Sequence, residues 1–150
     1  MDLSRPAGDL LEMVSLVIRG VSDNRELSLT AAAALGSLDR RGSQRITTMA
    51  AAEGVSQPSM TQLIQRLEQR GLVERTSDPA DGRVALVNLT DAGKAALTAR
   101  RQRNARRVAE LLAGLPENDV RALADALAAV LPQIRDRIGG ETRVASGTAS

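Results

Sequence analysis

The stretch that decides the fold is Val55–Thr90, which reads VSQPSMTQLIQRLEQRGLVERTSDPADGRVALVNLT. Its first part carries apolar residues at helical spacing, namely Met60, Leu63, Ile64 and Leu67. These residues form one stripe, so the opposite face of the predicted helix carries amides and hydroxyls. An ordinary solvated face would more often carry Glu and Lys, whereas Gln, Ser, Thr and Arg can hydrogen-bond to base edges and phosphates. The pattern therefore predicts a helix suited to a DNA groove.

The borders of this helix carry clear signals. Ser56 is a good N-cap, and Pro58 is tolerated in the first turn because its missing amide would have had no helical partner. Gly71 ends the helix. A shorter helix is predicted over residues 47–53, with Gly54 as a left-handed residue in the turn between the two helices. A short helix, a tight turn and a second helix form the helix-turn-helix pattern.

A hairpin is predicted directly after this helix. Leu72, Val73 and the pair Arg75-Thr76 favour a first strand, and residues 77–82 (SDPADG) are dense in turn formers. Residues 83–89 favour a returning strand. A hairpin that follows such a helix is a wing.

Two helices are predicted before the helix-turn-helix. The first covers residues 7–22, where a helical stripe consists of Leu10, Leu11, Val14, Val17, Ile18 and Val21. The second begins after Ser28 or Thr30, either of which can cap it, and runs to Leu38.

Two further helices are predicted after the wing. Thr90 or Asp91 caps a long helix that ends near Gly114, and Pro116 opens the last one. The apolar stripe of the last helix consists of Val120, Leu123, Leu127, Val130, Leu131, Ile134 and Ile138. Because Pro132 lies inside this stripe, a kink or a break is expected there. The small, polar segment 139–150 is predicted to be a flexible tail.

The composition of the chain excludes several kinds of chemistry. The 150 residues, which suit one domain, include no Cys, His, Phe, Tyr or Trp. Thiol chemistry, thiolate or imidazole metal sites, His-based catalysis and aromatic base-stacking are therefore excluded. With a single lysine and scattered carboxylates, no catalytic constellation is expected, and no cofactor. The chain has neither a secretory signal pattern nor an apolar stretch long enough for a membrane, so a cytoplasmic location is expected.

The formal net charge of +2 is distributed unevenly along the chain. Residues 39–107 contain 13 basic and 7 acidic side chains, whereas residues 1–38 contain 3 and 5, and residues 108–150 contain 4 and 6. A basic middle between acidic ends is expected when one part of a protein meets phosphate and the other parts meet protein.

Three segments, in this order and spacing, resemble the MarR family of bacterial transcriptional regulators. They are EGVSQPSMTQLIQRLEQRGLVER, the wing DPADGR, and VNLTDAGKAAL. The resemblance covers nearly the whole chain and implies a mainly α fold with a small β-wing. It implies dimerisation helices in 1–27 and 92–138 around a winged helix-turn-helix in 28–91, within one domain that ends in the tail 139–150.

The resemblance also implies where DNA would bind. Arg83 would enter the minor groove at the wing tip, and Asp81 would hold that arginine or buttress the wing. The major-groove face of the helix would carry Ser56, Gln57, Ser59, Thr61 and Gln62. Many relatives carry an arginine where Gln62 stands, so the contact here shifts from guanine toward a base such as adenine. From their spacing, Gln65 and Arg66 on the same helix are further DNA-binding candidates. Before the short helix, phosphate contacts are predicted for Arg40, Arg41 and Arg45.

The apolar stripes near both ends of the chain could serve an internal core or a dimer seam. A helix-turn-helix needs only part of them, and a monomer would expose the rest as a large apolar patch, so a homodimer is predicted. Two-fold symmetry then predicts a pseudopalindromic operator in double-stranded DNA. Occupancy of a promoter would make the protein a repressor, and an anionic small-molecule effector could release it, although its binding residues are unknown.

Some alternatives are left open by the sequence. The protein could be a winged-helix module for protein–protein interaction, or a non-specific architectural DNA binder. One run of arginines admits two interpretations, a solvated and partly ion-paired surface or a site for an anionic effector; these are Arg100, Arg101, Arg103, Arg106 and Arg107.

Overall fold

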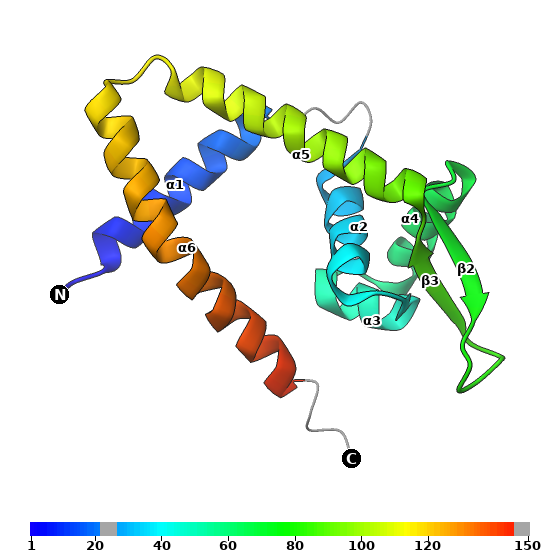
Figure 1. Cartoon of the computed structure of the whole chain (residues 1–150). Helices are drawn as coiled ribbons and strands as arrows, with labels where there is room; N and C mark the ends of the chain where they lie inside the picture. The colour runs from blue at the N-terminus through cyan, green and yellow to red at the C-terminus, as the bar shows by residue number, and fades with distance from the viewer. Residues whose placement is uncertain (22–26, 146–150) are drawn as a thin grey trace. The chain divides into compact units, whose positions relative to one another are not determined.

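A computed structural model describes residues 1–21 and 27–145, with side chains through residue 137 (Figure 1). The helices are α1 (Ser4–Val21), α2 (Leu29–Arg41), α3 (Ile46–Glu53), α4 (Gln57–Gln69), α5 (Asp91–Leu112) and α6 (Glu117–Ala145). The strands are β1 (Gln44–Arg45), β2 (Val73–Ser77) and β3 (Ala85–Leu89). The predicted mainly helical fold with a small wing is confirmed. The chain forms two compact units, Met1–Val108 and Ala109–Ser150.

The predicted caps of α2 and α4 are present, but two predicted bounds need correction. α1 begins at Ser4 rather than at residue 7, with residue 22 outside the described residues, and α2 continues past Leu38 to Arg41. The Ser28 side chain accepts a hydrogen bond from the Ala31 N–H at the start of α2, and Ser56 does the same for the Ser59 N–H in α4. Gly54 and Gly71 both adopt positive φ, at 63° and 71°, a region that side chains with a Cβ rarely enter. Local chemistry therefore determines where these helices begin and end.

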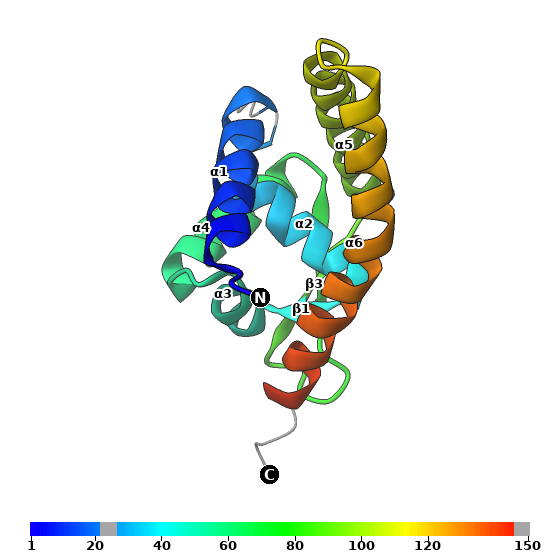
Figure 2. The ribbon, with the colours of Figure 1, turned by 90° about the vertical axis from the view of Figure 1, so that its left-hand side faces the viewer.

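The core lies where α2, α3 and α4 pack against the small sheet (Figures 1 and 2). Its most deeply buried side chains include Leu35, Met49, Met60, Ile64 and Val87. Since the sequence has no aromatic side chain, this core is filled by aliphatic residues and methionine. The buried alanines of α2 allow neighbouring elements to approach this helix closely, so that a core of small side chains contains few gaps.

The sheet has three antiparallel strands in the order β1-β3-β2. The two-residue strand β1 is absent from the sequence-based prediction. It pairs with the middle of β3, with Gln44 opposite Val87 and Arg45 opposite Leu86. The buried Gln44 side chain donates to the Ser37 hydroxyl at 3.1 Å, so β1 is tied to α2 as well as to the wing.

The predictions for the last helix need correction. A kink or a break was predicted at Pro132, and because α6 continues through Pro132 to Ala145 the break is wrong, as is the predicted end at residue 138. One proline removes a single backbone donor, and the alanines, leucines and arginines around it favour helix. Residues 139–145, expected in the flexible tail, are helical, and residues 146–150 lie outside the described residues.

The start of α5 is fastened to the turn that follows α4. The Thr90 hydroxyl donates to the Gly71 carbonyl at 2.7 Å and accepts from the Gly93 N–H at 3.0 Å. Thr90 is therefore the residue that caps α5. Gly93 is buried, and a Cβ built on it would lie 2.0 Å from the Leu72 carbonyl oxygen.

We predict that Gly93→Ala destabilises the protein by about 3 kcal/mol or more, because the added methyl group overlaps backbone that hydrogen bonds hold in place. Gly8→Ala on α1 is the control, since a Cβ there meets nothing within 4 Å and alanine favours helix. Urea denaturation followed by circular dichroism measures both variants. A Gly93→Ala variant as stable as the wild type would contradict this account of the junction.

Candidate nucleic-acid interface

Helix α4 presents a polar face to solvent because its apolar face is buried in the core. Met60 and Ile64 are fully buried, and Leu63 and Leu67 are nearly so. The candidate residues lie on the other side: Gln57, Ser59, Gln62, Gln65 and Arg66 are exposed, Thr61 is half-buried, and Ser56 is exposed at the N-cap. The structure therefore places the predicted contact residues of this helix together on one accessible surface.

Three hydroxyl groups at the start of α4 are already ordered by the protein. The Ser56 hydroxyl donates to Ser59 Oγ at 2.8 Å, and the Thr61 hydroxyl donates to the Gln57 carbonyl at 2.9 Å. Their orientation is set by the helix itself, and their oxygens can still accept hydrogen bonds. The glutamine amides supply donors and acceptors to the same face.

The wing begins immediately after α4 and is tied back to it. Leu72 N–H donates to the Leu67 carbonyl, which turns the chain into β2, and Arg75 Nε lies 3.2 Å from Glu68 Oε2. One backbone hydrogen bond and one ion pair therefore add to the core packing of Leu67 and Val73 in holding the helix against the first strand.

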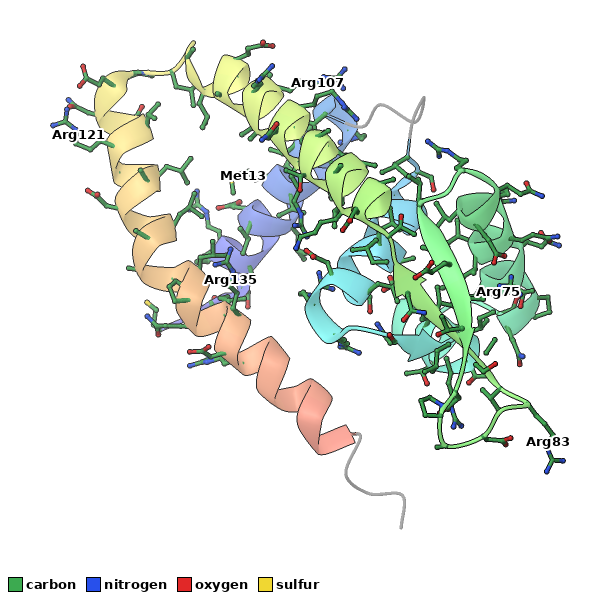
Figure 3. The ribbon with its side chains drawn as sticks, turned by 45° about the vertical axis from the view of Figure 1, so that its right-hand side comes forward. Met13, Arg75, Arg83, Arg107, Arg121 and Arg135 are labelled. Carbon is green, nitrogen blue, oxygen red and sulfur yellow. The ribbon has the colours of Figure 1, made fainter. Side chains whose placement is uncertain are left out.

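Arg83 extends outward from the tip of the wing (Figure 3). Its side chain is 97% exposed, and its Nε lies 3.8 Å from Asp81 Oδ1, which also accepts a hydrogen bond from the Arg83 N–H at 3.1 Å. Asp81 thus shapes the local turn and stays near the guanidinium. An arginine presented in this way can enter a groove with little rearrangement.

A second carboxylate, Asp78, supports the wing, and it is absent from the residues predicted from the sequence. Its side chain is buried; Oδ1 accepts from the Ala80 N–H at 2.9 Å, and Oδ2 accepts from Arg45 Nε at 3.0 Å and Nη2 at 2.6 Å. The Ala80 N–H, and then the Arg45 guanidinium, lower the pKa of Asp78 below its ordinary value of 3.8. An Asp before Pro in a turn is a signal for the Ala80 contact, whereas nothing local indicates Arg45.

The three arginines predicted to contact phosphate lie in different settings. Arg40 and Arg41 are exposed in the last turn of α2, and Arg40 Nη1 lies over Gly36. Arg45 instead directs two of its guanidinium nitrogens to Asp78. Arg40 and Arg41 are thus presented to solvent, while Arg45 is engaged by the base of the wing.

The arginine run of α5 is largely engaged by the protein itself. Arg100 Nε donates to the Leu27 carbonyl at 3.4 Å and Arg107 Nη1 to the Val21 carbonyl at 2.9 Å. Arg101 Nη1 pairs with Asp39 at 3.3 Å. These contacts favour the interpretation of the run as a partly paired surface.

Other kinds of site find no support in the described part of the chain. Within residues 1–21 and 27–145, no group of three or more His, Cys, Asp or Glu could hold a metal ion. Among the helices described, none is long and apolar enough to cross a membrane.

Comparison with known proteins agrees with this geometry. Residues 27–85 match the sequence profile of the MarR family. An uncharacterized HTH-type transcriptional regulator of Mycobacterium bovis is 32% identical over 136 residues, which cover 87% of this chain and 95% of that protein.

Solved structures show the same fold. A transcriptional regulator of Thermotoga maritima matches with a TM-score of 0.74 at 21% identity, over 91% of this chain and 99% of the other. The PcaV transcriptional regulator of Streptomyces coelicolor, solved in complex with its natural ligand, matches with a TM-score of 0.56 at 25% identity, over 88% and 96%. Together the fold and the exposed face of α4 define a winged helix-turn-helix DNA-binding protein. The chain belongs to the MarR family of transcriptional regulators.

We predict a pH-dependent effect of Asp78→Asn, which keeps an acceptor for the Ala80 N–H but loses the charge that faces Arg45. A carboxyl whose pKa is lowered by folding stabilises the protein above its ordinary pKa, and this stabilisation is lost as the pH falls through the lowered value. The variant should therefore be less stable than the wild type at pH 7, and the difference in the free energy of unfolding should narrow as the pH falls below the ordinary value of 3.8. Urea denaturation at each pH measures it, with Glu117→Gln on the exposed surface as control. A gap independent of pH would contradict the assigned ion pair.

Proposed function

We propose that this protein is a repressor that binds a pseudopalindromic operator as a homodimer. The observation that carries the proposal is the exposed face of α4, which combines ordered hydroxyl groups with glutamine amides. The opposite, apolar face of α4 is buried in the core, and the neighbouring wing carries an exposed arginine at its tip. Such a surface suits base edges, which offer donors and acceptors, better than it suits solvent.

Each element has its own role in the proposed complex. Helix α4 lies in the major groove, where its residues from Ser56 to Arg66 contact bases and phosphates. Gln62 can form a pair of hydrogen bonds with adenine. Arg83 enters the minor groove beside it, and Arg40 and Arg41 contact phosphates.

The proposed dimer rests on apolar side chains that the single chain leaves uncovered. On α1, Leu10, Leu11, Val14 and Ile18 are 39% to 69% exposed, and on α6, Leu127, Val130, Leu131 and Ile134 are 41% to 50% exposed. Exposed apolar stripes of this kind on two helices mark an interface. With two-fold symmetry, the two copies of α4 would meet half-sites whose centres lie about ten base pairs apart.

An anionic small molecule is the proposed effector. A relative of this family, PcaV, was solved in complex with its natural ligand, and the arginines of α5 provide positive charge beside the first two helices. A ligand here would have to compete with carbonyl and carboxylate partners that these arginines already have. It would release DNA only to the extent that it binds better to the form that does not fit the operator.

We predict that selection from randomised duplex DNA enriches a palindromic sequence. The enriched duplex should bind at least about 10³-fold more tightly than a scrambled duplex at the same salt concentration. Because the chain has no Tyr or Trp, the fluorescence of labelled DNA is the signal to follow. Absence of enrichment would reject the operator, and binding that merely fades with salt would indicate an architectural protein or a protein-binding module instead.

We predict that Arg83→Ala weakens binding to the selected duplex by about tenfold and reduces its salt dependence by about one unit of slope per subunit. The physical reason is loss of an exposed guanidinium that faces backbone and groove. Arg121→Ala, which removes the same group from an exposed pair with Glu117 on α6, is the matched control. Equal affinities for both variants would show that the wing tip does not meet DNA.

We predict a particle of twice the 15.8 kDa chain mass in sedimentation equilibrium. Leu131→Glu should shift it toward the monomer, because a carboxylate cannot be buried cheaply in an apolar interface. Since Leu131 is 42% exposed in the single chain, its replacement should not unfold α6. Gln133→Glu introduces the same group two positions away and should leave the mass unchanged; a monomeric wild type would refute the dimer.

A further inference from the structure

One ion pair crosses the outer face of the small sheet. Arg45 lies on the edge strand β1, opposite Leu86 of the central strand, and Leu86 lies opposite Thr76 of β2. Asp78 follows Thr76 by two residues and so continues the same face. The guanidinium therefore reaches from one edge of the sheet, across the central strand, to the residue that follows the other edge strand, where two hydrogen bonds of 3.0 and 2.6 Å hold it.

The outer part of the wing has little else to hold it. Between Val73 and Val87, which belong to the core, the single buried residue is Asp78. An isolated hairpin of this length is marginally stable in water, because it buries too little apolar surface. The outer part of the wing, beyond the core residues Val73 and Val87, is therefore attached to the body of the protein through a carboxylate rather than through hydrophobic packing.

The two partners are well placed to connect the wing with the helix-turn-helix. Arg45 directly precedes α3, so its backbone belongs to the helix-turn-helix. The Asp78 N–H donates a hydrogen bond of 2.8 Å to the carbonyl of Val84, the residue that follows Arg83 in the chain. A displacement of the ion pair would therefore displace the backbone beside Arg83 as well.

We propose that Arg45 and Asp78 are a positioning pair that holds the wing in the orientation in which Arg83 meets the minor groove. This inference rests on the DNA-binding role proposed above and assigns Arg45 a task other than direct phosphate contact. Arg45 acts through Asp78, and Asp78 acts through the loop that carries Arg83. Both residues therefore contribute to affinity only as long as Arg83 is present.

The test is a thermodynamic cycle on the selected duplex. Arg45→Ala and Asp78→Asn should each weaken binding by about fivefold or more, and by less than about twofold when Arg83 is already alanine. Neither should reduce the salt dependence beyond the reduction that Arg83→Ala causes. Arg121→Ala, again, should change neither quantity in either background.

A different pattern would overturn the proposal. If Arg45 contacts phosphate itself, Arg45→Ala weakens binding equally with and without Arg83 and lowers the salt slope by about one further unit, while Asp78→Asn has no effect. If the wild type selects no operator, the proposed repressor function fails first, before the pair is at issue.

Hydrogen exchange of the free protein tests the same pair without DNA. Peptides from residues 74–86 should exchange faster in Arg45→Ala and Asp78→Asn than in the wild type, whereas peptides from α4 should be unchanged. This result would also show that both variants are folded. Unchanged exchange in the wing would refute the anchoring role whatever the DNA measurements show.

Discussion

Burial of one apolar face of α4 is the constraint on which the rest of the structure depends. A helix advances about 100° per residue, so a rotation by one position in either direction would expose Met60 and Leu67 and would bury polar side chains, among them Gln62 or Gln65. The cost of that exchange determines which side chains face outward. In a core without aromatic rings, the buried Ala31 and Ala34 of α2 allow its neighbours to approach closely, so the core of small side chains contains few gaps.

Most of the fold could be predicted because its signals are local. The helical spacing of apolar residues, the caps at Ser28 and Ser56, and the left-handed glycines at 54 and 71 each act within one or two turns of chain. Strand β1 could not be predicted, because two residues carry no periodicity and form a strand only by pairing with β3, some forty residues later. The continuity of α6 at Pro132 was missed because a single proline weighs less than its helix-favouring neighbours, and its end was placed too early because residues 139–150 are small and polar.

The same distinction between local and distant signals applies to the residues of the candidate site. The outward face of α4 follows from periodicity, and the exposure of Arg83 follows from the turn before it. The partner of Arg45 does not, because Asp78 lies 33 residues along the chain and no local signal connects the two side chains. The α5 arginines were equally undetermined, since the groups that accept from Arg100 and Arg107 are backbone carbonyls, which have no signature in sequence.

The tight junction at Gly93 gives α5 the mechanical character of a lever. Its first turn is fastened to the residues that follow α4, so a rotation of α4 would carry the start of α5 with it. With 22 residues, α5 is about 33 Å long at 1.5 Å per residue. A tilt of about 10° at its root therefore displaces its far end by about 6 Å, which exceeds the rise of one base pair. By the same geometry, a small force applied at the far end of α5 exerts a large torque on the start of the helix, and hence on the orientation of α4.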